Sequence, residues 1–233
     1  MEVEPLLLSA WLPQLLQTAD PLFPTGSYAH SFGLEEMVRL GVVRDEDSLS
    51  SFMTDHLLPQ LSGWDLPALR FGIIAAANME ELCALDSEIH AWKLPSEARS
   101  ASIQIGARRI RTLCLTSQNA TLLAYDELIR NRLTHGHHIV ACALQALVHS
   151  SPLEAALLSY GYQSCAGACT AALKLIRIGQ EGTQRALANS LRELPVTVGD
   201  SLTVERDRMS SFSPMLEIAC MRHALADERL FIS

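Results

Sequence analysis

Apolar residues recur at steps of three and four over most of this chain, which is the spacing of one face of an α-helix. The clearest stretch lies between residues 66 and 92, and its apolar stripe comprises Phe71, Ile74, Leu82, Leu85, Ile89 and Trp92. A turn is expected to interrupt this stripe near Leu85 and Asp86. Strict alternation of apolar and polar residues, which marks a half-buried strand, is nearly absent. The pattern therefore predicts an all-α fold.

Proline and glycine residues set the expected helix boundaries. Pro95 opens a helix that is predicted to run to about Ser117, and further helices are predicted over residues 120–132, 137–149, 152–176 and 215–226. Residues 181–193 are also predicted to be helical, with Pro195 preventing an extension. The segment 196–213 is predicted to be an irregular, mobile loop. The whole chain, residues 1–233, is expected to form a single-domain bundle of about eight to ten helices.

The predicted helix at 152–176 is unusually rich in small residues. They are Ser159, Gly161, Ser164, Ala166, Gly167, Ala168 and Ala171. Small side chains let neighbouring helices approach closely. We therefore expect this helix to be the central, buried helix of the bundle.

Composition and charge narrow the possible functions. The chain has 233 residues, of which 48% are hydrophobic and 19% charged, a composition typical of a globular protein. Its formal charge of -8 argues against nucleic-acid binding, which favours clustered Lys and Arg. Six cysteines without C-x-x-C spacing are expected to be reduced thiols. With no apolar run of about 18 residues and no secretory signal pattern at the start, a soluble cytoplasmic protein is expected.

The stretch DPLFPTGSYAHSFGLEE, residues 20–36, is the first candidate for chemistry. Ser27 or Ser31 as nucleophile with His30 as base would make it a catalytic loop. A serine hydrolase needs G-x-S-x-G after a strand, and the order Gly26, Ser27, Tyr28, Ala29, His30 has the wrong spacing. Gly33 is followed by Leu34 and Glu35 without a lysine, so a phosphate-binding P-loop is excluded as well.

The same stretch has the properties of a docking surface. Pro21 and Pro24 restrict the backbone before Gly26 turns it, and the loop presents Tyr28 and His30 from a pre-organised segment. A stiff loop with an aromatic residue loses little conformational entropy when it binds a partner. A turn that only caps the following helix remains the alternative interpretation.

A second candidate is the histidine-rich stretch Thr134 to His138. His138 and Cys142 are four residues apart and are expected to share a helix face, a spacing that suits zinc or nickel. A small helical metal-dependent enzyme that uses His135, His138 and Cys142 is therefore the alternative function. Gly136 interrupts the set and no carboxylate lies nearby in the sequence, which argues against a dedicated metal site.

Several polar residues near helix ends have two interpretations each. Lys174, at the end of the small-residue helix, either extends to solvent or serves a partner. Gln180 and Gln184 share a helix face, and either a neighbouring helix or a partner can meet them. His223 lies on the apolar stripe of the last predicted helix and is expected to be partly buried, whereas Arg222 lies on a different face.

Four stretches together resemble the urease accessory protein UreF family. They are LLQTADPLFPTGSYAHSFGLEEMV near the start, LPSEARSASIQIGARRI in the middle, ALKLIRIGQEGTQRAL after the small-residue helix, and SPMLEIACMRHALADERLFIS at the end. They occur in the family's order and are spread over nearly the whole chain. Agreement at all four is much more specific than agreement at any one.

The resemblance implies an all-helical, cytoplasmic, non-catalytic chaperone without a resident cofactor or metal. Family members bind the accessory protein UreD, also called UreH, and through it the GTPase UreG and apo-urease, and they help nickel insertion as homodimers. Nucleic acid and membranes are not among the implied partners. Nine residues are expected to contact partners. Two of them, Tyr28 and His30, belong to the loop, and the others are carried over by motif: Glu35, Lys174, Gln180, Gln184, Arg185, Arg222 and His223.

Overall fold

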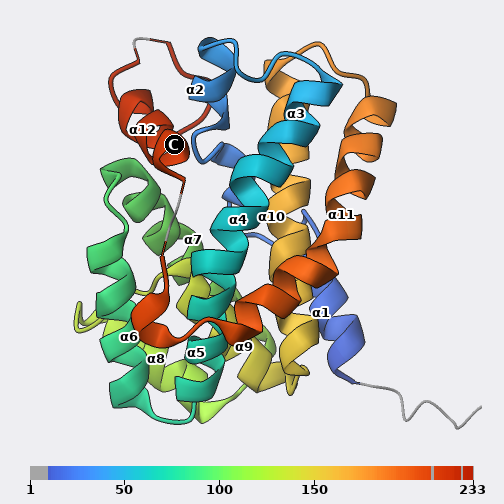
Figure 1. Ribbon diagram of the computed structural model, residues 1–233. Coiled ribbons are helices and arrows are strands. Elements are labelled where there is room, and N and C mark those ends of the chain that lie inside the picture. Colours follow the sequence, from blue (N-terminus) through green and yellow to red (C-terminus); the bar gives the residue numbers. More distant parts are fainter. Residues whose placement is uncertain (1–9, 211–212, 227, 233) are drawn as a thin grey trace, which may run out of the picture.

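All regular structure in the described part of the chain is helical, which confirms the all-α prediction (Figure 1). The computed structural model describes residues 10–210, 213–226 and 228–232. Its α-helices are α1 (Trp11–Ala19), α2 (Leu34–Arg39), α3 (Glu46–Phe52), α4 (Leu58–Gln60), α5 (Leu66–Ala75), α6 (Met79–Trp92), α7 (Ser96–Thr116), α8 (Ala120–Arg130), α9 (His138–His149), α10 (Leu153–Leu175), α11 (Gln180–Thr203) and α12 (Pro214–His223). Because α3 to α5 are one continuous rod, the described residues form ten α-helices, within the predicted number.

The rod from α3 to α5 includes two π-helical turns, η2 (Met53–Leu57) and η3 (Leu61–Asp65). Asp45 starts it with a capping box, in which its carboxylate accepts the Ser48 N–H at 2.9 Å and the Ser48 hydroxyl accepts the Asp45 N–H at 3.0 Å. Pro59 and Pro67 each follow a π-helical turn. Proline cannot donate a hydrogen bond to the preceding turn, and in this rod each of the two preceding turns is π-helical.

The turn that was expected near Leu85 and Asp86 lies earlier in the chain. Helix α5 ends at Ala75, and Asn78 caps α6 by accepting the N–H groups of Glu80 and Glu81 at 3.1 and 3.4 Å. Leu85 and Asp86 are inside α6 and fully buried. The prediction was wrong because Asp86, a charged residue within the apolar stripe, is buried with hydrogen-bond partners of its own and does not interrupt the helix.

The most deeply buried helix is α9, and not α10 as the small residues had suggested. Every residue of α9 from Ile139 to Ala146 is buried. In α10 only one face is buried, and its other face exposes residues such as Tyr162 and Leu173. Small residues do bring a neighbour close, since a Cβ on Gly161 would lie 2.5 Å from the Leu194 side chain of α11. Close approach on one side does not make a helix central.

Helix α11 continues through Pro195 to Thr203, so the predicted helix end and the irregular loop are wrong for residues 196–203. Figure 1 shows α11 changing direction along its length, with its later turns running toward α5. Leu194 and Val198 are buried on the side of the helix that joins the core. The Arg70 guanidinium of α5 donates to the carbonyl of Leu202 at 2.8 Å and to that of Val204. Tertiary packing therefore overrides the local preference of proline.

Replacing Pro195 with alanine is expected to raise the free energy of unfolding by about 2 kcal/mol, and Tm by about 4–8 °C. Alanine restores the N–H that can donate to the carbonyl of Leu191 and removes the clash of the proline ring. Thermal unfolding followed by circular dichroism measures the change. Pro214→Ala is the control, because Pro214 is the first residue of α12, where proline is favoured and the change should stay within about 0.5 kcal/mol. A lower Tm for Pro195→Ala would show that the packing of α11 requires proline.

Buried apolar side chains from Leu34 of α2 to Phe231 near the other end of the sequence belong to one cluster. Helix α12 packs against α2 and α7. Figure 1 shows α2, α3, α12 and the link between α10 and α11 at the same end of the bundle. No described helix has both the length and the apolar character needed to cross a membrane.

Candidate functional site

The stretch from Asp20 to Glu36 is a compact loop whose shape depends on two glycines. Gly26 and Gly33 have φ values of +77° and +89°, in the left-handed region that side chains with a Cβ rarely adopt. A Cβ on Gly26 would lie 2.1 Å from the Arg108 guanidinium of α7, and one on Gly33 would lie 2.9 Å from the Cys220 sulfur of α12. The loop is therefore fitted closely against α7 and α12.

Glu35, the second residue of α2, holds residues 228–232, which we call the C-terminal segment. One carboxylate oxygen accepts the Leu230 N–H at 2.7 Å, and the other accepts the Phe231 N–H at 3.0 Å. The Ile232 N–H donates to the carbonyl of Ala29 at 2.9 Å. The C-terminal segment is thus bound along the loop that begins more than two hundred residues earlier in the sequence.

His223 joins the same carboxylate to a second one. Its Nε2 lies 2.9 Å from Glu35 Oε2, and its Nδ1 lies 3.0 Å from Glu97 Oε2 on α7. Glu97 also binds Arg229 of the C-terminal segment at 2.6 Å. Burial opposes ionisation of Glu35, but the hydrogen bonds from Leu230, His223 and Phe231 outweigh it and lower the pKa of Glu35 below its usual 4.5.

The neighbouring Glu36 is buried and holds two arginines. Its Oε2 accepts from Arg39 Nε at 2.6 Å, and its Oε1 accepts from Arg39 Nη2 at 2.7 Å and from Arg222 Nε at 2.8 Å. The hydrogen bond from Arg39 is the main reason why the pKa of Glu36 is lowered. Both adjacent glutamates of α2 therefore bind α12, and Glu35 binds the C-terminal segment as well.

Lys174, at the end of α10, is exposed beside two aromatic rings. Its ammonium lies 5.9 Å from the ring centroid of Tyr28 and 5.2 Å from that of Phe231. Such distances allow a cation–π attraction. Tyr28, in η1 (Ser27–Ala29), is 69% exposed. The loop, α10 and the C-terminal segment thus meet at one surface that carries an accessible aromatic ring and a cation.

The first turns of α11 carry the remaining candidates. Gln180, Gln184 and Arg185 are exposed. The guanidinium of Arg185 forms two hydrogen bonds to the Glu46 carboxylate of α3, at 2.8 and 2.7 Å. This ion pair ties α11 to α3 and leaves the two glutamine side chains exposed.

The three proposed metal ligands do not form a site. His138 Nε2 and Cys142 Sγ are 3.2 Å apart, but the ring of His135 stacks on that of His90 with centroids 3.6 Å apart. No group of three His, Cys, Asp or Glu side chains in the described residues is arranged to hold a metal ion. Burial lowers the pKa of His138 and raises that of the Cys142 thiol, so both are kept neutral. The geometry therefore gives the metal-dependent enzyme no support.

Comparison with known proteins decides the family. A family model described as UreF matches residues 43–191, which is more than half of the chain. The chain belongs to the UreF family. A protein named urease accessory protein UreF from Dechloromonas aromatica (strain RCB) is 31% identical over 224 residues, covering 95% of this chain and 97% of the relative. A relative of the same name from Paenarthrobacter aurescens (strain TC1) is 32% identical over 219 residues, covering 94% of this chain and 96% of the relative. Another, from Haemophilus influenzae (strain PittEE), is 27% identical over 224 residues, covering 95% of this chain and 95% of the relative.

UreF proteins are non-catalytic accessory proteins of urease maturation, so the resemblance inferred from the four sequence motifs is confirmed. Nine residues had been carried over or chosen as partner contacts. Six are exposed in this UreF chain: Tyr28, Lys174, Gln180, Gln184, Arg185 and Arg222. His30 and His223 are buried, with exposed fractions of 6% and 1%, and the side chain of Glu35 is 14% exposed.

The three less exposed residues, His30, Glu35 and His223, support the surface and do not form it. Burial, with a smaller contribution from the charge of Arg108, lowers the pKa of His30, a buried residue of the loop itself. His223 and Glu35 hold α12 and the C-terminal segment in place. Sequence reasoning missed Glu36, Arg39 and Glu97. The spacing of Glu36 and Arg39, three residues apart on a helix, is a signal that could have indicated the first pair.

Proposed function

We propose that this chain is the UreF component of a urease maturation complex. It binds the accessory protein UreD, also called UreH, and through it recruits and regulates the GTPase UreG at apo-urease. Nickel is the cargo of this complex, and the chain holds no cofactor of its own. A homodimer in the cytoplasm is part of the same proposal.

The observation that carries this proposal is the composite surface at one end of the bundle. It is built from the glycine-shaped loop, the end of α10 and the C-terminal segment, which are joined by Glu35 and by the Lys174 contacts. An exposed aromatic ring on a stiff loop, next to a long cation, has the composition of a binding hot spot. The start of α11 lies at the same end of the bundle (Figure 1).

A non-catalytic protein regulates a GTPase through differential binding. If the surface binds one nucleotide state of UreG more tightly than the other, the complex shifts UreG toward that state. Residues held by buried carboxylates suit this role, because a pre-organised surface loses little conformational entropy when it binds a partner.

Co-purification tests the proposal. Full-length chain carrying an affinity tag is expected to retain UreD, and to retain UreG only when UreD is present. Lys174→Ala is expected to reduce the recovered UreD or UreG on the order of tenfold, which corresponds to about 1.4 kcal/mol of lost binding free energy. Gln180→Ala tests the start of α11 in the same way.

Arg192→Ala is the matched control, because Arg192 is an exposed cation like Lys174 and lies on α11 like Gln180, but three turns further along that helix. It should leave both partners bound. Failure of the unaltered chain to retain UreD would refute the proposed function. Full retention of both partners by Lys174→Ala and Gln180→Ala would refute the assignment of the surface.

A further inference from the structure

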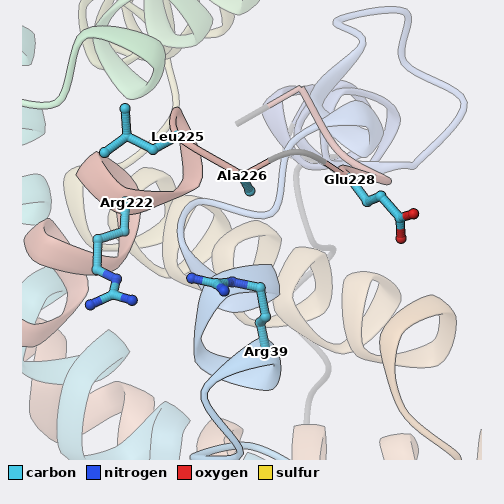
Figure 2. A pocket seen from close by; sticks show the side chains of 5 residues that line it. All are labelled: Arg39, Arg222, Leu225, Ala226 and Glu228. Atoms are coloured by element: carbon cyan, nitrogen blue, oxygen red, sulfur yellow. The ribbon is translucent and has the colours of Figure 1, made fainter.

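A pocket opens between α2 and the end of α12, next to the surface described above. Its volume is about 560 Å³, and it is lined by Arg39, Arg222, Leu225, Ala226 and Glu228. Figure 2 shows the guanidinium group of Arg39 extending from α2 toward that of Arg222 on α12. Both arginine side chains are about half exposed, at 52% and 51%.

The two guanidinium groups are fixed in place by Glu36, whose side chain is only 1% exposed. Arg39 uses its Nε–H and one Nη group in this contact, and Arg222 uses its Nε–H alone. Within residues 10–210, 213–226 and 228–232, one Nη group of Arg39 and both Nη groups of Arg222 have no other hydrogen-bond acceptor, so these donors face the pocket. Held guanidinium groups bind a second oxyanion with little further loss of side-chain entropy.

The charges favour an anion. Two arginines around one carboxylate give a local charge of +1, on a chain whose formal charge is -8. One arginine would suffice to pair Glu36, and the second adds like-charge repulsion that a bound anion would relieve. Glu228 also lines the pocket, but its carboxylate points away from both guanidinium groups (Figure 2).

Part of the lining is apolar. Leu225, with an exposed fraction of 83%, and Ala226 line the same pocket as the arginines. The volume is far larger than one inorganic ion requires. A lining that combines guanidinium groups with aliphatic side chains fits a carboxylate that is carried on an aliphatic stem.

We propose that the pocket between α2 and α12 binds an acidic side chain of a partner protein, with its carboxylate on Arg39 and Arg222 and its stem on Leu225. The choice of a protein carboxylate rests on the proposed role in docking. The site itself rests on the pocket, the held guanidinium groups and the apolar part of the lining.

A titration of the full-length chain followed by NMR tests this. The probe is the blocked dipeptide acetyl-Leu-Glu-amide, and acetyl-Leu-Gln-amide is its neutral match. The glutamate peptide is expected to produce saturable shifts of the Nε–H signals of Arg39 and Arg222, and the glutamine peptide at the same concentrations none. Arg222→Gln should weaken binding roughly tenfold or more, since a charge-assisted pair is lost.

Three further variants complete the test. Glu228→Gln removes a negative charge from the lining and should strengthen binding roughly two- to threefold. Arg185→Gln is the matched control, because Arg185 also pairs with a glutamate through two hydrogen bonds but lies on α11 away from the pocket. It should not change the affinity. Arg39→Gln replaces Arg222→Gln if thermal unfolding shows that the latter is not folded.

Equal shifts with both peptides, or no shift with either, would overturn the proposal. Tighter binding of inorganic phosphate than of the glutamate peptide would also overturn it, in favour of a site for a free anion. If the peptide does not bind while the chain still co-purifies with UreD, the pocket assignment alone fails. If the peptide binds but UreD is not retained, the proposed function fails and the anion site stands.

Discussion

Replacing Asp86 with alanine is expected to lower the free energy of unfolding by about 4 kcal/mol, and Tm by about 8–16 °C. Asp86 is fully buried in α6 and accepts four hydrogen bonds from the segment that leads into α9. Oδ2 accepts from the Thr134 hydroxyl at 2.7 Å and from the N–H groups of His135 and Gly136 at 2.7 and 2.9 Å, and Oδ1 accepts the His137 N–H at 2.9 Å.

The effect is large because alanine leaves three backbone donors without their acceptor at the start of the most buried helix. The same segment is tightly packed, since a Cβ on Gly106 of α7 would lie 2.1 Å from the carbonyl oxygen of Gly136. Burial also lowers the pKa of His137 to about 3, so this imidazole stays neutral and the Asp86 carboxylate acts here through its hydrogen bonds and not through an ion pair with His137. Denaturant and thermal unfolding measure the change.

Asp126→Ala is the matched control for Asp86→Ala. Asp126 is another buried aspartate on a helix, but it pairs with Arg130, whose side chain is 66% exposed. Its loss should cost about 1 kcal/mol or less. Equal losses of stability in the two variants would show that the segment before α9 does not depend on the Asp86 carboxylate.

Replacing Glu35 with alanine is expected to release the C-terminal segment while the bundle stays folded. The Leu230 and Phe231 N–H groups lose a charged acceptor, which is worth about 2 kcal/mol of local opening free energy. Hydrogen exchange at these two amides should therefore become roughly thirtyfold faster or more. NMR-detected exchange on the full-length chain measures this, together with the exchange of amides in α9 as an internal reference.

Glu46→Ala provides the comparison for Glu35→Ala. Glu46 is also a glutamate at the start of a helix, and it pairs with the exposed Arg185. It should leave exchange at Leu230 and Phe231 unchanged. Unchanged exchange at these amides in Glu35→Ala would mean that the C-terminal segment is held by Arg229 and the Phe231 ring instead. Because this segment forms part of the proposed docking surface, Glu35→Ala should also reduce recovery of the UreD and UreG partners.

The sequence by itself determined the helices whose signals are local. The three- and four-residue spacing of apolar positions, Pro95, Pro152 and Gly179 placed α7, α8, α9 and α10 within one or two residues of their observed ends. Four motifs in order gave the family and therefore the non-catalytic role. Such signals need only neighbouring residues, because helix periodicity and termini depend on the nearest turns.

Only the tertiary structure decided which residues meet across the chain. Arg222 and Glu36 are 186 residues apart, and Phe231 and Glu35 are 196 apart, so no local pattern pairs them. The passage of α11 through Pro195 and the burial of α9 rather than α10 depend on the neighbours that pack against them. A local sequence specifies which face of a helix is apolar, whereas the choice of the partner for that face is made by the packing of the whole core.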